Sequence, residues 1–106
     1  MKERRPLISQ EVLARYAADA ALGVGGVAGL ANGPLNRGKP VSVSVSGDED
    51  TLAIELTLEL EWGQSSAEVG KEVQRRVSEY LERMANVAPA SVEVVVGAVS
   101  SPPPRR

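Results

Sequence analysis

The chain has 106 residues, the length of one domain with a modest hydrophobic core. Hydrophobic residues make up 42% of it, supplied mainly by 15 Val, 10 Leu and 13 Ala, so we expect a folded chain with a thin core. Cys and His are both absent. Their absence excludes disulfides and thiolate metal sites, and it removes the usual general base of enzymes.

Charge is divided unevenly along the chain, although the net charge is only -2. Residues 41–70 hold seven Asp/Glu and no Lys or Arg, whereas residues 1–40 hold six Lys/Arg against three acids and residues 71–106 six against four. A broad basic surface is therefore missing, and we expect no nucleic-acid partner. The charged segment Met1–Arg5 leads into no apolar stretch, and no apolar run is long enough to span a bilayer, which predicts a cytoplasmic location.

The first element after a charged arm (residues 1–6) is expected to be a helix over Gln10–Leu22, with Ser9 as its N-cap and Gly23 at its end. An i, i+3, i+4 pattern predicts its buried face, made of Leu13, Tyr16, Ala17, Ala20 and Ala21. Residues 24–30 are expected to form a short strand whose glycines allow close packing or a bulge. Residues 31–40, rich in Gly, Pro and Asn, are expected to form a loop.

Alternation of apolar and polar residues predicts a β-hairpin in the middle of the chain. With a four-residue turn over Gly47–Asp50, the expected pairs are Val45–Leu52, Val43–Ile54 and Val41–Leu56. The second strand continues its apolar face through Leu58, Leu60 and Trp62 and so overshoots the hairpin. Its end either pairs elsewhere in the domain or meets another molecule.

A capping box, Ser65-x-x-Glu68, predicts the start of a second helix, and Asn86 is expected to stop it in the left-handed conformation. The expected apolar face of this helix consists of Val69, Val73, Val77, Tyr80, Leu81 and Met84. Two i, i+4 ion pairs are expected on its polar face, Glu72–Arg76 and Glu79–Arg83.

The last predicted element is a strand over Ser91–Val99, followed by a proline-rich tail over residues 100–106 that we expect to be disordered. Alternation assigns one face to Val92, Val94, Val96 and Ala98, and the other to Glu93, Val95, Gly97 and Val99. The second face is too apolar for full exposure. The predicted fold class is α/β of the α+β type: two helices packed on one face of a small, mostly antiparallel sheet, in the order α-β-β-β-α-β.

Three groups of residues carry a family resemblance. They are Ile8-Ser9-Gln10-Glu11-Val12-Leu13 with Ala20-Ala21 and Val24-x-Gly26-Val27-x-x-Leu30; Val41-x-Val43-x-Val45 with the long strand ending in Trp62-Gly63; and Val73-Gln74-Arg75-Arg76-Val77 with Met84 and Val92-x-Val94-x-Val96. In this order and spacing they resemble the alkaline-shock-protein family, the general-stress or envelope-stress-response group of Gram-positive and related bacteria. The resemblance covers residues 7–99 and marks them as one alkaline-shock-protein-like domain.

Two departures from the family pattern stand out. Members usually carry Tyr at the position of Trp62, and Met-Thr-Gly-Leu where this chain has Met84-Ala85-Asn86-Val87. The resemblance implies a non-enzymatic cytoplasmic protein linked to cell-envelope homeostasis or stress, without catalytic residues or cofactors. It also implies self-association and, as in some members, a link to the membrane through a separate membrane-anchoring protein.

A row of acids on the polar face of the long strand was weighed as a catalytic site. Glu59 and Glu61 are two positions apart, a spacing of ~7 Å that suits an inverting glycosidase. We favour a solvated strand face, which also carries Glu55 and Thr57, because a catalytic pair needs a pocket that nothing in the sequence builds. No small-molecule substrate or cofactor is therefore expected.

Three further patterns have plain readings. Asp48-Glu49-Asp50 is read as a polar turn, since its spacing fits no calcium loop, so no metal is expected. Gly23-x-Gly25-Gly26 follows a helix and precedes a strand, the reverse of a phosphate-binding loop. These glycines leave a small KH-like nucleic-acid-binding domain as the alternative function, against which the acidic middle argues.

Basic residues at the two ends either solubilise the chain or attract it to an anionic membrane; they are Lys2, Arg4, Arg5, Arg105 and Arg106.

Self-association is the function that the sequence favours most. The overshooting strand, the two-faced final strand and the thin core all point to a homo-oligomer. The candidate interface residues are Leu58, Leu60, Trp62, Val95 and Val99. Trp62 is the expected anchor, since Trp is enriched among interface hot spots; the alternative is that it caps the core. We therefore expect a structural or regulatory scaffold that acts through protein–protein contacts.

Overall fold

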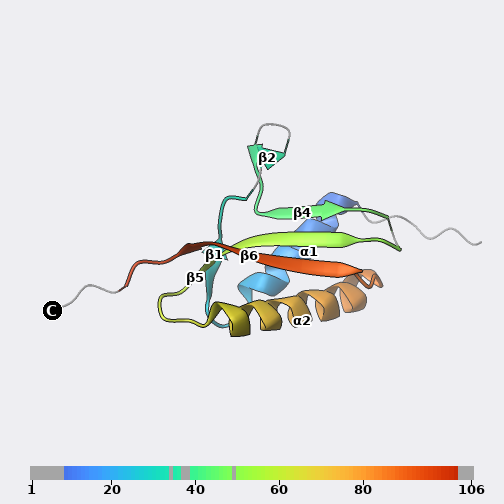
Figure 1. The fold of residues 1–106 in the computed structure, drawn as a ribbon. Coiled ribbons are helices and arrows are strands. Elements are labelled where there is room, and N and C mark those ends of the chain that lie inside the picture. Colours follow the sequence, from blue (N-terminus) through green and yellow to red (C-terminus); the bar gives the residue numbers. More distant parts are fainter. Residues whose placement is uncertain (1–8, 34, 37–38, 49, 103–106) are drawn as a thin grey trace, which may run out of the picture.

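A computed structural model describes residues 9–33, 35–36, 39–48 and 50–102. The expected charged arm and the last four residues of the tail lie outside these ranges. The fold is a small sheet with two helices on one face (Figure 1), as the alternating and helical patterns predicted. In the main sheet the elements follow the expected order α-β-β-β-α-β.

The central strand of the sheet is β5 (Ala53–Leu60). β4 (Val43–Ser46) pairs antiparallel with its first half and β1 (Val27–Leu30) antiparallel with its second half. β6 (Ser91–Val99) runs parallel to β5 along its whole length, so it occupies the opposite edge. The overshooting end of β5 therefore pairs within the domain, with β1 and β6, and the first of the two expected alternatives holds.

The register of the central hairpin differs from the expected one by two residues. Val43 pairs with Leu56 and Val45 with Ile54, because the turn is longer than four residues. The Asp48 carboxylate stabilises this longer turn by accepting hydrogen bonds from the main-chain N–H of Asp50 and of Thr51, at 3.0 and 3.1 Å. A shift of two residues keeps every side chain on its predicted face, so the core is unaffected.

The first helix, α1 (Gln10–Leu22), has the expected bounds, and Ser9 caps it by accepting a hydrogen bond from the Val12 N–H. Gly23 ends it in a right-handed conformation and not the left-handed one. The following strand β1 is shorter than expected, and it contains the bulge that its glycines allowed, between Val27 and Gly29. Within the expected loop, β2 (Leu35–Asn36) and β3 (Lys39–Pro40) pair with each other.

The second helix, α2 (Ser66–Ala85), begins after Ser65, whose hydroxyl accepts a hydrogen bond from the Glu68 N–H, and ends at Asn86 with φ 56°. Val69, Val73, Val77 and Leu81 are buried as predicted, whereas Met84 is 47% exposed. The Glu72–Arg76 ion pair forms at 2.9 Å. The other expected pair is replaced: Arg75 binds Glu79, and Arg83 lies over the Tyr80 ring.

The core lies between the helices and one face of the sheet, where the fully buried side chains include Ile54, Leu56 and Leu58 of β5 and Val73, Val77 and Leu81 of α2. Each such side chain stabilises the fold by roughly 1.5–3 kcal/mol. Ala17 and Ala21 of α1 are 0% exposed, so the alanine-rich face of this helix packs closely within the core. Tyr16 and Tyr80 join the two helices in an edge-to-face contact at 5.8 Å.

Candidate interaction surface

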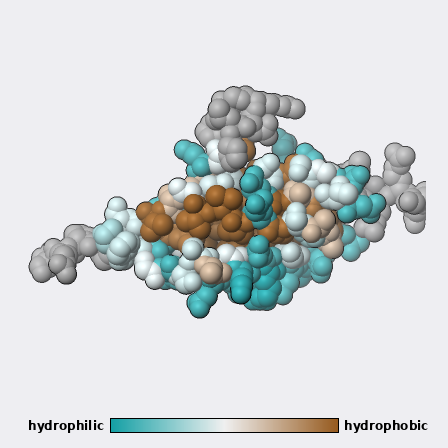
Figure 2. Space-filling view, viewed as in Figure 1, coloured by the Kyte–Doolittle hydropathy of each residue, from teal (hydrophilic) through white to brown (hydrophobic). Residues whose placement is uncertain are grey.

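β6 forms an edge of the main sheet and carries exposed apolar side chains. Val95, Val96 and Val99 are 39%, 38% and 54% exposed. Figure 2 shows apolar side chains gathered over the region of β6 on the face turned to the viewer. Exposed apolar residues that gather on one strand edge are typical of a protein–protein interface.

A bulge near the end of β6 changes which residues share a face. Leu58 of β5 pairs with Val96 and Glu59 pairs with Ala98, so Gly97 is the extra residue. Ala98 therefore shares a face with Glu93 and Val95, and Val99 turns to the helix side, the reverse of the predicted assignment. The alternation reverses because one inserted residue moves each later side chain to the opposite face.

Trp62 extends the apolar strip beyond the end of β6. Its main-chain N–H donates to the Ser100 hydroxyl at 3.1 Å, and the Ser100 N–H donates to the Leu60 carbonyl at 2.8 Å. Its side chain is 58% exposed, so Trp62 does not cap the core. We define the β6 strip as Val95, Val96, Val99 and Trp62.

Two of the five candidate interface residues lie elsewhere. Leu58 and Leu60 are 0% and 2% exposed, because their side chains point from β5 into the layer between sheet and helices. The expectation that they form a surface is wrong. Val96 is also exposed, although it was not among the candidate interface residues, since the exposure of an edge strand depends on what lies beside it.

The backbone of β6 presents alternate residues to its free edge. The Ser91 N–H donates to the carbonyl of Leu52, the residue just before β5. Because backbone groups of successive strand residues point to opposite sides, those of Val92, Val94 and Val96 point away from β5. The side-chain amide of Gln74 on α2 donates to the Val92 carbonyl at 2.9 Å. Among the described residues, Gln74 thus covers the start of the edge, and Val94 and Val96 form its open part.

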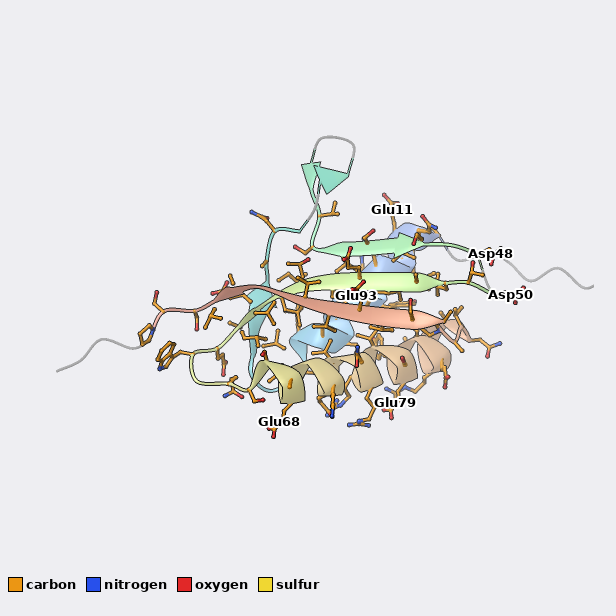
Figure 3. The ribbon with its side chains drawn as sticks, viewed as in Figure 1. Glu11, Asp48, Asp50, Glu68, Glu79 and Glu93 are labelled. Atoms are coloured by element: carbon orange, nitrogen blue, oxygen red, sulfur yellow. The ribbon has the colours of Figure 1, made fainter. Side chains whose placement is uncertain are left out.

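The sheet face opposite the helices is polar around Glu55 and Glu93, which are direct neighbours on β5 and β6. Glu93 interrupts the apolar surface in the middle of this face (Figure 3), and a shallow hollow of about 170 Å³ lies beside it. Glu59 is half-buried on the same face, whereas Glu61 is exposed and lies beyond the end of the strand. The two acids weighed as a catalytic pair therefore do not share a regular strand spacing.

The acidic turn and the glycine segment both have structural roles. Hydrogen bonds from the Thr51 hydroxyl and from the main-chain N–H of Thr51 and Asp50 lower the pKa of Asp48 below its ordinary value. Glu49 lies outside the described residues. Gly26, with φ +97°, packs so closely that an added Cβ would lie 2.9 Å from Val69 Cγ2, which explains the glycine without a phosphate ligand.

A groove between α1 and α2 holds a network of charges. It has a volume of about 470 Å³ and is lined by both acids and arginines, among them Asp19, Arg75, Arg76 and Glu79. Hydrogen bonds from Arg75 and Arg76 lower the pKa of Glu72, and the hydrogen bonds that Arg75 donates to Glu72 and Glu79 raise the pKa of Arg75. Arg75 and Arg76 of this groove are already held in ion pairs with Glu72 and Glu79.

A family model described as the alkaline shock protein 23 family, with a cell envelope-related function, matches residues 2–101. The chain belongs to this alkaline-shock-protein family. The match confirms the resemblance that the residue pattern indicated, and it links the family member to the cell envelope. No curated protein sequence matches the chain at significant similarity.

Solved structures of MamM CTD share the fold. One, MamM-CTD, is 15% identical, covers 85% of this chain and 99% of that chain, and has a TM-score of 0.61. A cadmium form is 16% identical with coverages of 85% and 98% and a TM-score of 0.61, and a copper form is 14% identical with 88% and 100% and 0.62. At these identities the likeness shows the fold alone, which supports the α+β class.

Within residues 9–33, 35–36, 39–48 and 50–102, no three Asp or Glu side chains are grouped so that they could hold a metal ion. In the same part of the chain, neither helix is long and apolar enough to cross a bilayer.

Proposed function

We propose that this member of the alkaline-shock-protein family is a non-enzymatic scaffold linked to the cell envelope, which acts through protein–protein contacts that include self-association. The β6 strip is the observation that carries the proposal. It places three valines and a tryptophan, each more than a third exposed, on and beside one sheet edge. Such a surface loses contact with water when a partner covers it, and this favours association.

The rest of the surface supports a binding role over a catalytic one. The hollow beside Glu55 and Glu93 is small, and Arg75 and Arg76 of the helix groove are held in ion pairs with Glu79 and Glu72. Neither arrangement prepares a group for acid–base or nucleophilic chemistry, which needs a positioned residue with a matched pKa. We therefore place the function in contacts with other proteins and expect no substrate.

A cytoplasmic protein with an envelope-related function needs a route to the envelope. We infer that this route is a separate membrane-anchoring protein, bound through surfaces of the domain. The basic residues of the two ends can add attraction to anionic lipids. Fluorescence of the tagged full chain in cells tests this: we expect a peripheral signal, and a signal spread evenly through the cytoplasm would contradict it.

The test of self-association is sedimentation from low to high micromolar concentration, with Trp62→Ala as the variant. We expect the wild type to associate reversibly and Trp62→Ala to weaken association at least tenfold, since truncating a hot-spot residue costs about 2 kcal/mol. Because its side chain is 58% exposed, the substitution should leave the melting temperature nearly unchanged.

The matched control is Met84→Ala, which truncates a side chain of similar exposure, 47%, at the far end of the molecule from Trp62. It should associate like the wild type. A wild type that stays monomeric throughout the concentration range would contradict the proposed self-association.

A further inference from the structure

The open part of the β6 edge is short and has defined limits. Gln74 covers the Val92 carbonyl on one side, and the bulge at Gly97 interrupts the regular strand on the other. Between these limits only Val94 and Val96 present their backbone N–H and C=O groups outward. A strand that binds here must pair with these two residues.

A second copy of β6 meets this requirement in one antiparallel register. Residues that point outward pair with residues that point outward, so Val94 of one copy lies opposite Val96 of the other, and about four main-chain hydrogen bonds form. Val95 then faces Val95 of the second copy across a twofold axis. These two side chains are 39% exposed in the single chain and cover each other in the pair.

Charge repulsion and the Gln74 hydrogen bond favour this register over the registers centred on Val94 and on Glu93. Centred on Val95, it places Glu93 opposite Gly97 of the second copy, where no side chain competes for space. Centring on Val94 uses the Val92 carbonyl that Gln74 already occupies. Centring on Glu93 sets two carboxylates directly opposite each other, which is destabilising.

The helix beside the edge also allows two copies to approach. A twofold axis perpendicular to the sheet brings α2 of each copy next to the other, since α2 lies along β6 (Figure 1). The side of α2 nearest this edge, marked by Gln74, carries short residues one turn before and after it, Gly70 and Ser78. A Cβ added at Gly70 would meet no atom within 4 Å, so the single chain offers no steric reason for this helix glycine.

A glycine in the middle of a helix is unfavourable relative to alanine. Close approach of a second α2 gives it a function that the single chain does not. The open backbone positions, the position of Glu93 and the small residues of α2 all favour the same partner for this edge, a second copy of β6.

We propose that two copies of this chain pair through their β6 strands, antiparallel and about a twofold axis at Val95. The pair forms one continuous sheet, with the four helices on the same face. This inference rests on the self-association proposed above and names its geometry. It uses the β6 strip directly, because Val95 and Val96 lie at the centre of the interface.

A disulfide test measures the register, because the chain has no cysteine of its own. Val95 faces its counterpart in a non-hydrogen-bonded pair with Cα atoms about 4.5 Å apart, within the range of a disulfide. Under mild oxidation most of the V95C variant should become a covalent dimer. The control E93C places its two cysteines four residues apart along the strands, about 13 Å, and should stay uncrosslinked.

The outcomes separate this inference from the proposed self-association. If the wild type sediments as an oligomer while V95C fails to crosslink, or E93C crosslinks as well as V95C, the β6 register is wrong and self-association stands. A mixture of V95C and E93C that crosslinks between the two variants would show the register centred on Val94. A wild type that is always monomeric would overturn both proposals.

Charge exchange at the axis gives a second, independent readout. V95K and V95E each place like charges opposite each other, so each alone should associate at least about fivefold more weakly than the wild type. An equal mixture of the two should recover association, because Lys and Glu then face each other. Circular dichroism and melting of each variant check the fold, and a mixture no stronger than its components would overturn the register.

Discussion

Gly97 shows how one residue decides which side chains an edge strand presents. A Cβ at this position would lie 2.6 Å from Thr57 Cγ2 and 3.3 Å from Ala31 Cβ, so the strand can bulge here only because Gly has no side chain. Thr57, which lies next to Gly97, is itself only 4% exposed. The bulge turns Val99 toward the helix side and leaves Ala98 on the face of Val95, and it thereby sets the composition of the β6 strip.

The contact between Gly97 and Thr57 predicts a specific coupling. Gly97→Ala should lower the free energy of unfolding by about 1–3 kcal/mol, because a methyl group is forced into a filled space. Thr57→Ser removes the Cγ2 atom and keeps the hydroxyl, so in the double variant part of this loss should be recovered. Chemical denaturation of the four proteins measures the coupling energy. Strictly additive losses would show that the added Cβ does not meet Thr57.

At the scale of elements, local signals predicted most of the fold. The bounds of α1 follow from Ser9, and the left-handed stop of α2 from Asn86. The bounds of β6 agreed with its alternating pattern, and two helices on one face agreed with the amphipathic stripes. These features depend on residues near in sequence, whose spacing carries the information directly.

The features that sequence reasoning missed depend on hydrogen bonds inside a turn and on contacts between residues far apart in the sequence. The hairpin register was wrong because hydrogen bonds from Thr51 and Asp50 to Asp48 make a longer turn. Leu58 and Leu60 were assigned to an interface because the strands that cover β5 on both edges could not be placed. Three of the five candidate interface residues, Trp62, Val95 and Val99, are exposed as the sequence predicted.

The turn between β4 and β5 should make part of the stability depend on pH. The pKa of Asp48 is lowered in the folded chain by its hydrogen bonds to Thr51 and Asp50, so the folded state holds this proton less tightly than the unfolded state. The contribution is therefore full above the ordinary pKa of Asp and is lost as pH falls through the lowered value.

We expect Asp48→Asn to lower the melting temperature slightly at about pH 5 and above, and the difference from the wild type to vanish at acidic pH, below the lowered pKa of Asp48. The control is Asp50→Asn, because Asp50 contributes its main-chain N–H to the turn and not its carboxylate. It should leave the pH profile of melting unchanged. Equal acid sensitivity of the wild type and Asp48→Asn would refute the role of this carboxylate.

The whole molecule combines a thin core with an incomplete edge. Among the described residues, its buried hydrophobic side chains are Val, Leu, Ala and one Ile, with no aromatic. The main sheet is three strands wide, because β4 and β1 share one side of β5 and β6 lies on the other. The outer strand β6 has exposed valines and backbone groups that point outward. Pairing of two such edges doubles the sheet and buries apolar surface that the single chain leaves in water. Stability and assembly are thus expected to be linked.

This linkage predicts that thermal stability depends on protein concentration. A partner that binds only the folded state stabilises it in proportion to the logarithm of its concentration. The melting temperature of the wild type should therefore rise by a few degrees over about a hundredfold increase in concentration. For V95K the melting temperature should stay constant over the same range, since like charges at the axis weaken pairing while the exposed position leaves the core intact. Calorimetry at several concentrations makes the comparison, with Met84→Ala as the variant that should follow the wild type. If the wild type and V95K share one concentration-independent melting temperature, the folded domain is complete as a monomer and the β6 edge does not contribute to its stability.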